Sequence, residues 1–184
     1  SGCGYVSDAI DAIEYSKAMG ARIVNCSWGG QEENPALRDV MENSTGQVFI
    51  CAAGNSAAAF PTYPAAYGLP NILSIAANDN RGNLASFSNY GSGVHASAPG
   101  VDILSTVSGG GYGYLSGTSM AAPHASGIAA LLLSTDPGMR AVEVVARIRT
   151  YVAVSSKLLG KVASGGMVDA AGALTGVMPE PLPD

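Results

Sequence analysis

Short apolar runs alternate with amphipathic stretches along the first half of the chain. Three such runs lie at 22–30 (RIVNCSWGG), 47–55 (QVFICAAGN) and 71–79 (NILSIAAND). Their apolar residues are consecutive rather than alternating, and glycine or a polar residue ends each run. Each run is therefore predicted to be a strand that is buried on both faces.

A helix is predicted over 8–19, before the first of these strands. Ser7 can cap its N-terminus, Asp8 lies in its first turn, and Gly20 follows its end. Its apolar face is formed by Ile10, Ile13 and Ala18.

A second helix is predicted over 34–44, with Asn34 as its cap and Pro35 at its first position. Buried strands that alternate with helices are typical of a parallel sheet that is covered on both sides. The pattern therefore predicts the α/β class.

The pattern changes in the last third of the chain. Residues 93–107 are predicted to form short strands joined by Pro99 and Gly100, and residues 108–117 a glycine-rich turn. The following small and apolar residues predict a long helix that begins near Ser119.

Asp136 and Pro137 are predicted to stop this long helix. The same pair is predicted to cap a further helix over 138–152. We find no internal repeat, and 47% apolar residues in 184 are enough for one packed domain.

Composition excludes two classes of partner. Only 12% of the residues are charged, the net charge is −5, and lysine and arginine form no cluster. A nucleic-acid or anionic-membrane surface is therefore not expected. The longest apolar runs, such as 127–133, are far shorter than the roughly 20 residues that span a bilayer.

The cysteines do not form a recognisable metal or disulfide pattern. Cys3, Cys26 and Cys51 are odd in number and lack C-x-x-C spacing. Cys26 and Cys51 fall in predicted strands, so we expect them to be buried free thiols.

Ser119 and His124 share one predicted helix. Ser119 lies where a turn becomes a helix, a position that suits either a helix cap or a nucleophile near unpaired backbone N–H groups. Five residues on a helix correspond to about 140° of rotation and about 7.5 Å of rise. His124 is therefore not expected to be the base for Ser119, and a structural role, packed under the helix, is predicted for it.

The only other histidine is His95, for which a structural role is also predicted. The stretch GTSMA differs by one residue from the G-x-S-x-G motif of α/β-hydrolases, whose histidine follows the serine. That order would require His124 as the base, so this alternative fails.

The stretch SGTSMAAPHASGIAALLL (116–133) closely resembles the serine signature of the subtilases, the subtilisin-like serine proteases. Other segments are similar to the same family in order and spacing: IVNCSWGG, AAGN, ASFSNYG, APGVDILST and GGMVDAAGAL. The resemblance runs from Gly2 to about Leu174. It implies a three-layer α/β fold whose mostly parallel sheet has helices on both faces.

The resemblance implies roles for individual residues. Ser119 would be the nucleophile and Asn55 the side-chain donor to the oxyanion. Ser27, Trp28 and Gly29 would form the strand that pairs with an extended substrate. Further substrate-binding residues would be Ala52, Ala53, Gly54 and Thr118.

The segment 56–68 would line the pocket for the residue before the scissile bond. It carries no charge, which favours neutral side chains there. Asp79 is similar to a position where some subtilases bind calcium, together with carbonyls near Pro64 and Ala66. Calcium prefers six to eight oxygen ligands, so a turn-capping role for Asp79 is an equal alternative. The chemistry itself requires no cofactor.

The subtilase triad runs Asp, His, Ser along the chain, and the aspartate and histidine motifs are not found in this sequence. The chain thus resembles roughly the last two thirds of a subtilase catalytic domain, with a partial domain over 1–176 and a proline-rich tail or linker over 177–184. The strand at 21–27 would then be a bare sheet edge. We expect it to need the missing N-terminal part or a second copy of the chain.

Three functional hypotheses follow. The first is a secreted serine endopeptidase, of which this chain alone is inactive. The second is a non-catalytic module that binds peptides or has a structural role. The third, an unrelated α/β protein in which GTSMA occurs by chance, is the weakest, because the similarity covers a dozen consecutive positions.

Overall fold

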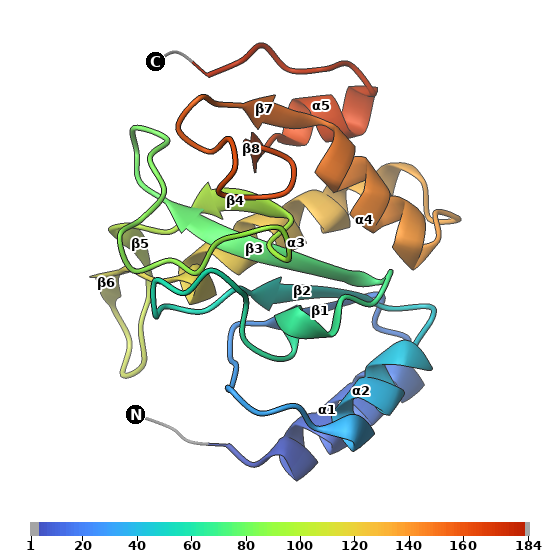
Figure 1. Ribbon diagram of the computed structural model, residues 1–184. Helices are drawn as coiled ribbons and strands as arrows, with labels where there is room; N and C mark the ends of the chain where they lie inside the picture. Colours follow the sequence, from blue (N-terminus) through green and yellow to red (C-terminus); the bar gives the residue numbers. More distant parts are fainter. Residues whose placement is uncertain (1–3, 183–184) are drawn as a thin grey trace.

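The fold is built around a six-stranded sheet, and the computed structural model describes residues 4–182 (Figure 1). The strand order is β1-β2-β3-β4-β8-β7, and only β7 runs antiparallel to its neighbour. The strands are β1 (Ile23–Cys26), β2 (Val48–Ala52), β3 (Ile72–Asn78), β4 (Ala96–Pro99), β7 (Val152–Val154) and β8 (Gly166–Val168). All three strands predicted from the first half of the sequence are present. β2 and β3 are fully buried as predicted, but the prediction of burial on both faces is wrong for the edge strand β1, in which Asn25 is exposed.

Helices cover both faces of the sheet. The helices are α1 (Val6–Ala18), α2 (Pro35–Glu42), α3 (Thr118–Thr135), α4 (Ala141–Thr150) and α5 (Ala170–Thr175), with a 3₁₀ turn η1 (Ala65–Tyr67). Side chains of β2 alternate between two apolar clusters, because successive residues of a strand point to opposite faces. Val48 and Ile50 pack with α3 and α4, whereas Phe49 and Cys51 pack with α1 and α2. This three-layer α/β architecture confirms the predicted fold class.

The predicted helix starts are partly correct. Asn34 caps α2 as predicted, because its Oδ1 accepts a hydrogen bond from the Leu37 amide at 3.0 Å. The prediction for α1 is wrong: the helix begins at Val6 with Tyr5 as its N-cap, so Ser7 lies inside the first turn. A tyrosine lacks the short side-chain acceptor that makes a cap visible in sequence.

The helix that follows α3 begins later than predicted. Asp136 ends α3, but it does not cap α4, which starts at Ala141 with Arg140 as its N-cap. The Glu143 carboxylate, in the first turn of α4, accepts a hydrogen bond from the Arg140 amide at 2.8 Å. This bond gives the N-cap amide the partner that a polar cap side chain does not provide here.

The glycine-rich segment is only partly a turn. Its second half forms β6 (Tyr112–Leu115), which pairs antiparallel with β5 (Ile103–Thr106) in a two-stranded ribbon that projects from the sheet (Figure 1). β7, β8 and α5 have no counterpart among the elements predicted from the sequence. The proline-rich tail folds back on the domain, where the Leu182 amide donates to the Val154 carbonyl at 2.8 Å.

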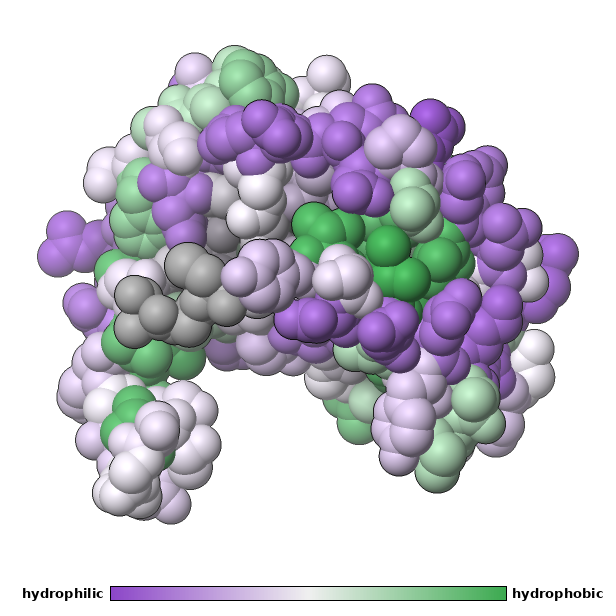
Figure 2. All heavy atoms as spheres, turned by 90° about the horizontal axis from the view of Figure 1, so that it is seen from below, coloured by the Kyte–Doolittle hydropathy of each residue, from purple (hydrophilic) through white to green (hydrophobic). Residues whose placement is uncertain are grey.

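Strand β1 forms one edge of the sheet, as predicted for the described part of the chain. Ile10 of α1 and Val24 of β1 are only partly buried here. Figure 2 views this side and shows an apolar patch surrounded by polar side chains. No helix among residues 4–182 is long and apolar enough to cross a membrane.

Candidate active site

The carboxyl ends of β1 and β2 and the N-terminus of α3 meet at one end of the sheet. Because parallel strands point their carboxyl ends toward the same edge, the residues that follow β1 and β2 are brought together there. They surround a cavity of about 250 Å³. Its lining contains only uncharged residues: Trp28, Gly29, Gly30, Gln31, Ala52, Gly54, Asn55, Ser56, Thr62, Thr118 and Ser119.

Ser119 is the second residue of α3 and is half-buried. Its hydroxyl donates a hydrogen bond to the Ser27 carbonyl at 3.0 Å. In return, the Ser27 hydroxyl donates to the Ser119 carbonyl at 2.8 Å. These two bonds connect the end of β1 to the start of α3. The backbone amide of Ser119 belongs to the first turn, where helical amides have no carbonyl partner within the helix.

Thr118 holds the side chain of Asn55. The Asn55 Oδ1 accepts hydrogen bonds from the Thr118 amide at 2.9 Å and from the Thr118 hydroxyl at 3.0 Å. The same hydroxyl accepts from the Gly54 amide at 3.1 Å, so this fully buried threonine is satisfied. With its oxygen fixed, the Asn55 carboxamide presents Nδ2 beside Gly117, next to Ser119.

Asn89, which the sequence analysis missed, organises the loop that carries Asn55. Its buried side chain accepts from the amides of Ser56 (2.9 Å) and Ala58 (3.1 Å) and donates to the Ala53 carbonyl at 3.0 Å. Asn89 belongs to the segment ASFSNYG, for which the family resemblance implies no role for any residue. Nothing local in the sequence marks an asparagine that acts on a loop more than thirty positions away.

The segment after β1 is held close to a neighbouring loop. Gly30 and Tyr63 exchange backbone hydrogen bonds of 2.9 and 3.0 Å. A Cβ atom at Gly29 would lie 2.8 Å from the Tyr63 carbonyl oxygen, so only glycine allows this approach. Trp28 is 40% exposed, so it lines the cavity and is not a core residue.

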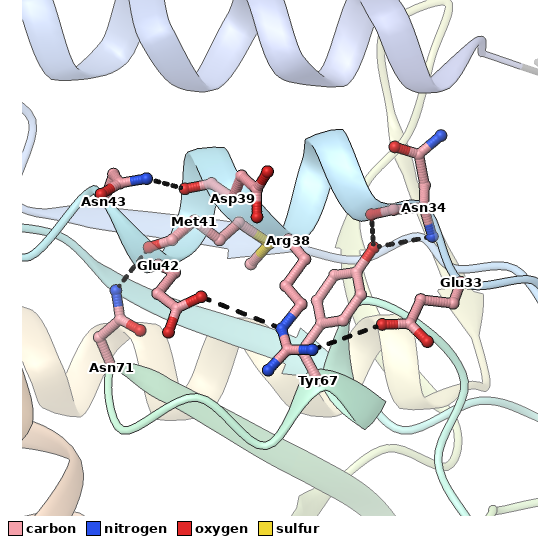
Figure 3. Close-up of polar contacts among 9 residues, drawn as sticks. All are labelled: Glu33, Asn34, Arg38, Asp39, Met41, Glu42, Asn43, Tyr67 and Asn71. Carbon is pink, nitrogen blue, oxygen red and sulfur yellow. Dashed lines mark hydrogen bonds and ion pairs between the residues drawn. The ribbon is translucent and has the colours of Figure 1, made fainter.

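A second, larger cavity lies on the other side of the same segment. It has a volume of about 640 Å³ and shares Trp28, Gly29 and Gly30 with the first. Tyr67 forms part of its wall, and its hydroxyl donates to the Asn34 carbonyl at 2.8 Å (Figure 3). Arg38 of α2 lies between the carboxylates of Glu33 and Glu42 on the surface beside it (Figure 3).

His124 is not packed under the helix, so that prediction is wrong. It is exposed, and its Nδ1 lies 3.0 Å from the Met120 carbonyl oxygen. The buried face of α3 is formed by alanines together with Ile128 and Leu132 instead, and the alanines allow the helix to pack closely on the sheet. His124 lines a cavity that also touches Ser119, but the Ser119 hydroxyl is hydrogen-bonded to Ser27.

His95 lies just before β4, and its ring hydrogen-bonds to the backbone of β3. Its Nδ1 accepts a hydrogen bond from the Ser74 amide at 3.0 Å. Burial, with a smaller effect of the Arg149 charge, lowers the pKa of His95 to about 4. The ring is therefore neutral at pH 7 and carries its proton on Nε2, as a structural histidine would.

The Asp79 carboxylate is engaged in its own turn. Its Oδ1 accepts from the amides of Arg81 and Asn83, both at 2.9 Å, and its Oδ2 accepts from the Asn83 side chain at 2.9 Å. These bonds, the Asn83 side chain first among them, lower the pKa of Asp79. The contacts match the turn-capping alternative, and they do not bring Asp79 into the cavity beside Ser119.

The buried pair Cys26 and Cys51 are free thiols, as predicted. Cys3 lies outside the described residues.

The family model and the curated relatives that match this chain indicate the same protein family. The model of the subtilase family matches residues 1–170. A thermophilic serine proteinase of Bacillus sp. (strain AK1) is 44% identical over 136 residues, which are 73% of this chain and 33% of that protein. Subtilisin Savinase of Lederbergia lenta is 38% identical over 146 residues, which are 78% of this chain and 54% of that protein.

Solved structures agree with the sequence relatives. A protease from Pseudoalteromonas arctica superposes with a TM-score of 0.81 at 27% identity, over 94% of this chain and 59% of that one. A cold-adapted subtilisin-like serine proteinase gives a TM-score of 0.76 at 32% identity, over 92% and 61% of the two chains. The chain thus spans about one third of the length of the Bacillus sp. proteinase and about one half of the length of Subtilisin Savinase.

Proposed function

Since the chain belongs to the subtilase family, we propose that it carries the nucleophile, an oxyanion donor and the substrate-binding strand of a serine endopeptidase. Ser119 is the proposed nucleophile, and Asn55 is the proposed donor. The observation that carries the proposal is the fixed carboxamide of Asn55. Its oxygen is held twice by Thr118, which leaves Nδ2 to donate beside the first turn of α3.

The proposed chemistry is attack of the Ser119 oxygen on the scissile carbonyl carbon. The negative charge that develops on the carbonyl oxygen would be stabilised by Asn55 Nδ2 and by the Ser119 amide, near the positive end of the α3 dipole. The general base would be a histidine from residues outside this chain, since His95 is bonded to Ser74 and His124 lies at the Met120 carbonyl. The Ser119 hydroxyl would then donate its hydrogen bond to that base instead of to the Ser27 carbonyl.

The proposed substrate is an extended polypeptide that pairs with the backbone of Ser27, Trp28 and Gly29. The uncharged lining of the smaller cavity supports a neutral side chain before the scissile bond. The larger cavity would accept a second side chain further upstream, because the two cavities share the Trp28–Gly30 segment. The chemistry of a subtilase needs no cofactor, and the Asp79 contacts do not argue for calcium.

The exposed edge of β1 supports the further proposal that the base reaches Ser119 on a segment that pairs with this strand. A second copy of the chain is the alternative source of such a segment. We also propose that the protein acts outside the cell, on the basis of its family alone.

The test is hydrolysis of a fluorogenic peptide, with a neutral residue before the scissile bond, by a protein that joins this chain to its upstream coding sequence. Ser119→Ala should remove the triad-dependent rate. Ser134→Ala is the matched control, because its exposed hydroxyl lies on the same helix and only bonds to the Leu131 carbonyl. Asn55→Ala should lower kcat about 10²–10³-fold, a loss known for such a donor in a subtilisin.

Unchanged hydrolysis by Ser119→Ala would overturn the nucleophile assignment. Peptide binding without any cleavage, in a chain with its upstream segment present, would instead support the non-catalytic peptide-binding module.

A further inference from the structure

Cys26 and Cys51 lie directly opposite each other in the sheet, next to but outside the candidate active site. They are register partners in the parallel pair β1 and β2, so both side chains point to the same face. Both are 0% exposed, and both belong to the apolar cluster beneath α1 and α2. The two sulfurs are thus the only pair of thiols that the described residues bring together, and neither takes part in the proposed chemistry.

The spacing of the strands is informative about what this pair can bind. Neighbouring strands lie about 4.8 Å apart, and the side chains of register partners in a parallel pair run side by side. A disulfide needs Cβ atoms at about 3.5–4.5 Å, so it would require β1 and β2 to move closer. An ion with two collinear bonds to sulfur, each close to the 2.3 Å of a zinc–thiolate bond, spans about 4.6 Å without such movement.

The surroundings favour a soft ion over a hard one. No group of three His, Cys, Asp or Glu side chains that could hold a metal exists among residues 4–182, so the four-coordinate cage of zinc cannot form there. The cluster around the thiols is apolar and contains the buried thioether of Met41, another soft donor. Thiolate and thioether ligands suit Cu(I), zinc and iron–sulfur clusters, and of these Cu(I) is the one that does not need a four-ligand cage, which residues 4–182 do not offer.

We propose that Cys26 and Cys51 form a two-thiolate binding site for a soft monovalent cation of the Cu(I) class. The ion would bridge β1 and β2 just before Ser27 and Ala52, where both strands enter the candidate active site. Before the proposed base-bearing segment pairs with it, β1 is hydrogen-bonded to a strand on one side only within the described residues, so the ion would reach the thiols when β1 opens locally.

Binding must be coupled to pH. Burial, followed by the neighbouring Cys26 thiol, raises the pKa of Cys51 well above its ordinary value. The Cys51 thiol must lose its proton to coordinate the ion. Affinity should therefore rise as the pH rises.

The test uses Ag⁺ as an air-stable probe of the same class, titrated into the 184-residue chain in which Cys3→Ala removes the third thiol. Native mass spectrometry should show one ion per chain, and titrations at pH 6, 7 and 8 should show the rise in affinity. Adding Cys26→Ala or Cys51→Ala should weaken binding by at least about 100-fold, because one ligand is lost. Circular dichroism checks that these variants fold.

A second measurement does not depend on the buried variants. Bound Ag⁺ should protect both thiols of the Cys3→Ala chain from alkylation during brief denaturation, as read by peptide mass mapping. Equal affinity in the single-cysteine variants, or alkylation of both thiols in the presence of one equivalent of Ag⁺, would overturn the proposal.

Discussion

Protonation of His95 should destabilise the fold. In the folded chain its Nδ1 accepts the Ser74 amide and its pKa is lowered to about 4, whereas an unfolded histidine has a pKa near 6.5. As the pH falls below about 6.5, the unfolded chain therefore takes up this proton first. The stability contributed by His95 is present above this range and is lost progressively down to the folded pKa.

The size of the effect follows from the two pKa values. A difference of about 2.5 pKa units corresponds to about 3 kcal/mol when the transition is complete, and about 2 kcal/mol of it is lost between pH 7 and pH 4.5. The His95 ring is mostly buried, so solvent screening reduces this figure only modestly.

The assay is urea unfolding of the chain and of His95→Asn at pH 7 and pH 4.5. Asparagine can place its Oδ1 where the Ser74 amide donates, but it does not titrate. The carboxylates contribute equally to the pH dependence of the free energy of unfolding in both proteins, so their contribution cancels in the comparison. The variant should therefore lose about 2 kcal/mol less than the parent chain between the two pH values.

An independent check is NMR titration of the His95 ring in a His124→Gln background, which leaves one histidine signal. A folded pKa near 6.5, or the same pH dependence of unfolding in His95→Asn, would refute the reasoning.

Two further predictions concern side chains that connect distant segments. Asn89→Ala removes three buried hydrogen bonds from the loop that carries Asn55. Chemical denaturation should therefore show that the free energy of unfolding falls by about 3 kcal/mol or more. The control Asn43→Ala, on the surface, should lower it by less than about 1 kcal/mol. Arg22 donates hydrogen bonds to the carbonyls of Gly46, Pro137 and Met139. Arg22→Met should therefore lower the free energy of unfolding by about 1–3 kcal/mol. The control Arg38→Met loses only exposed ion pairs and should lower it by less than about 1 kcal/mol. A variant no less stable than its control would contradict the corresponding prediction.

Strands and helices with a complete local signal could be predicted from the sequence. The continuous apolar runs at β1, β2 and β3 and the Asn34–Pro35 start of α2 carry their structural preference within a few residues. The missed strands β7 and β8 are three residues each, too short to show a period. The starts of α1 and α4 were misplaced because Tyr5 and Arg140 lack the short polar side chain of a usual cap.

The candidate site divides in the same way. The sequence by itself determined the α/β class and the family resemblance, and it was enough to propose Ser119, Asn55 and the segment after β1 as site residues, because these lie in motifs of consecutive residues. Only the tertiary structure decided which side chains hold them in place. The pairing of Thr118 with Asn55 and the support from Asn89 join segments more than thirty residues apart, and so does the contact between Ser119 and Ser27. Such contacts depend on how parallel strands align their ends, which no local pattern encodes.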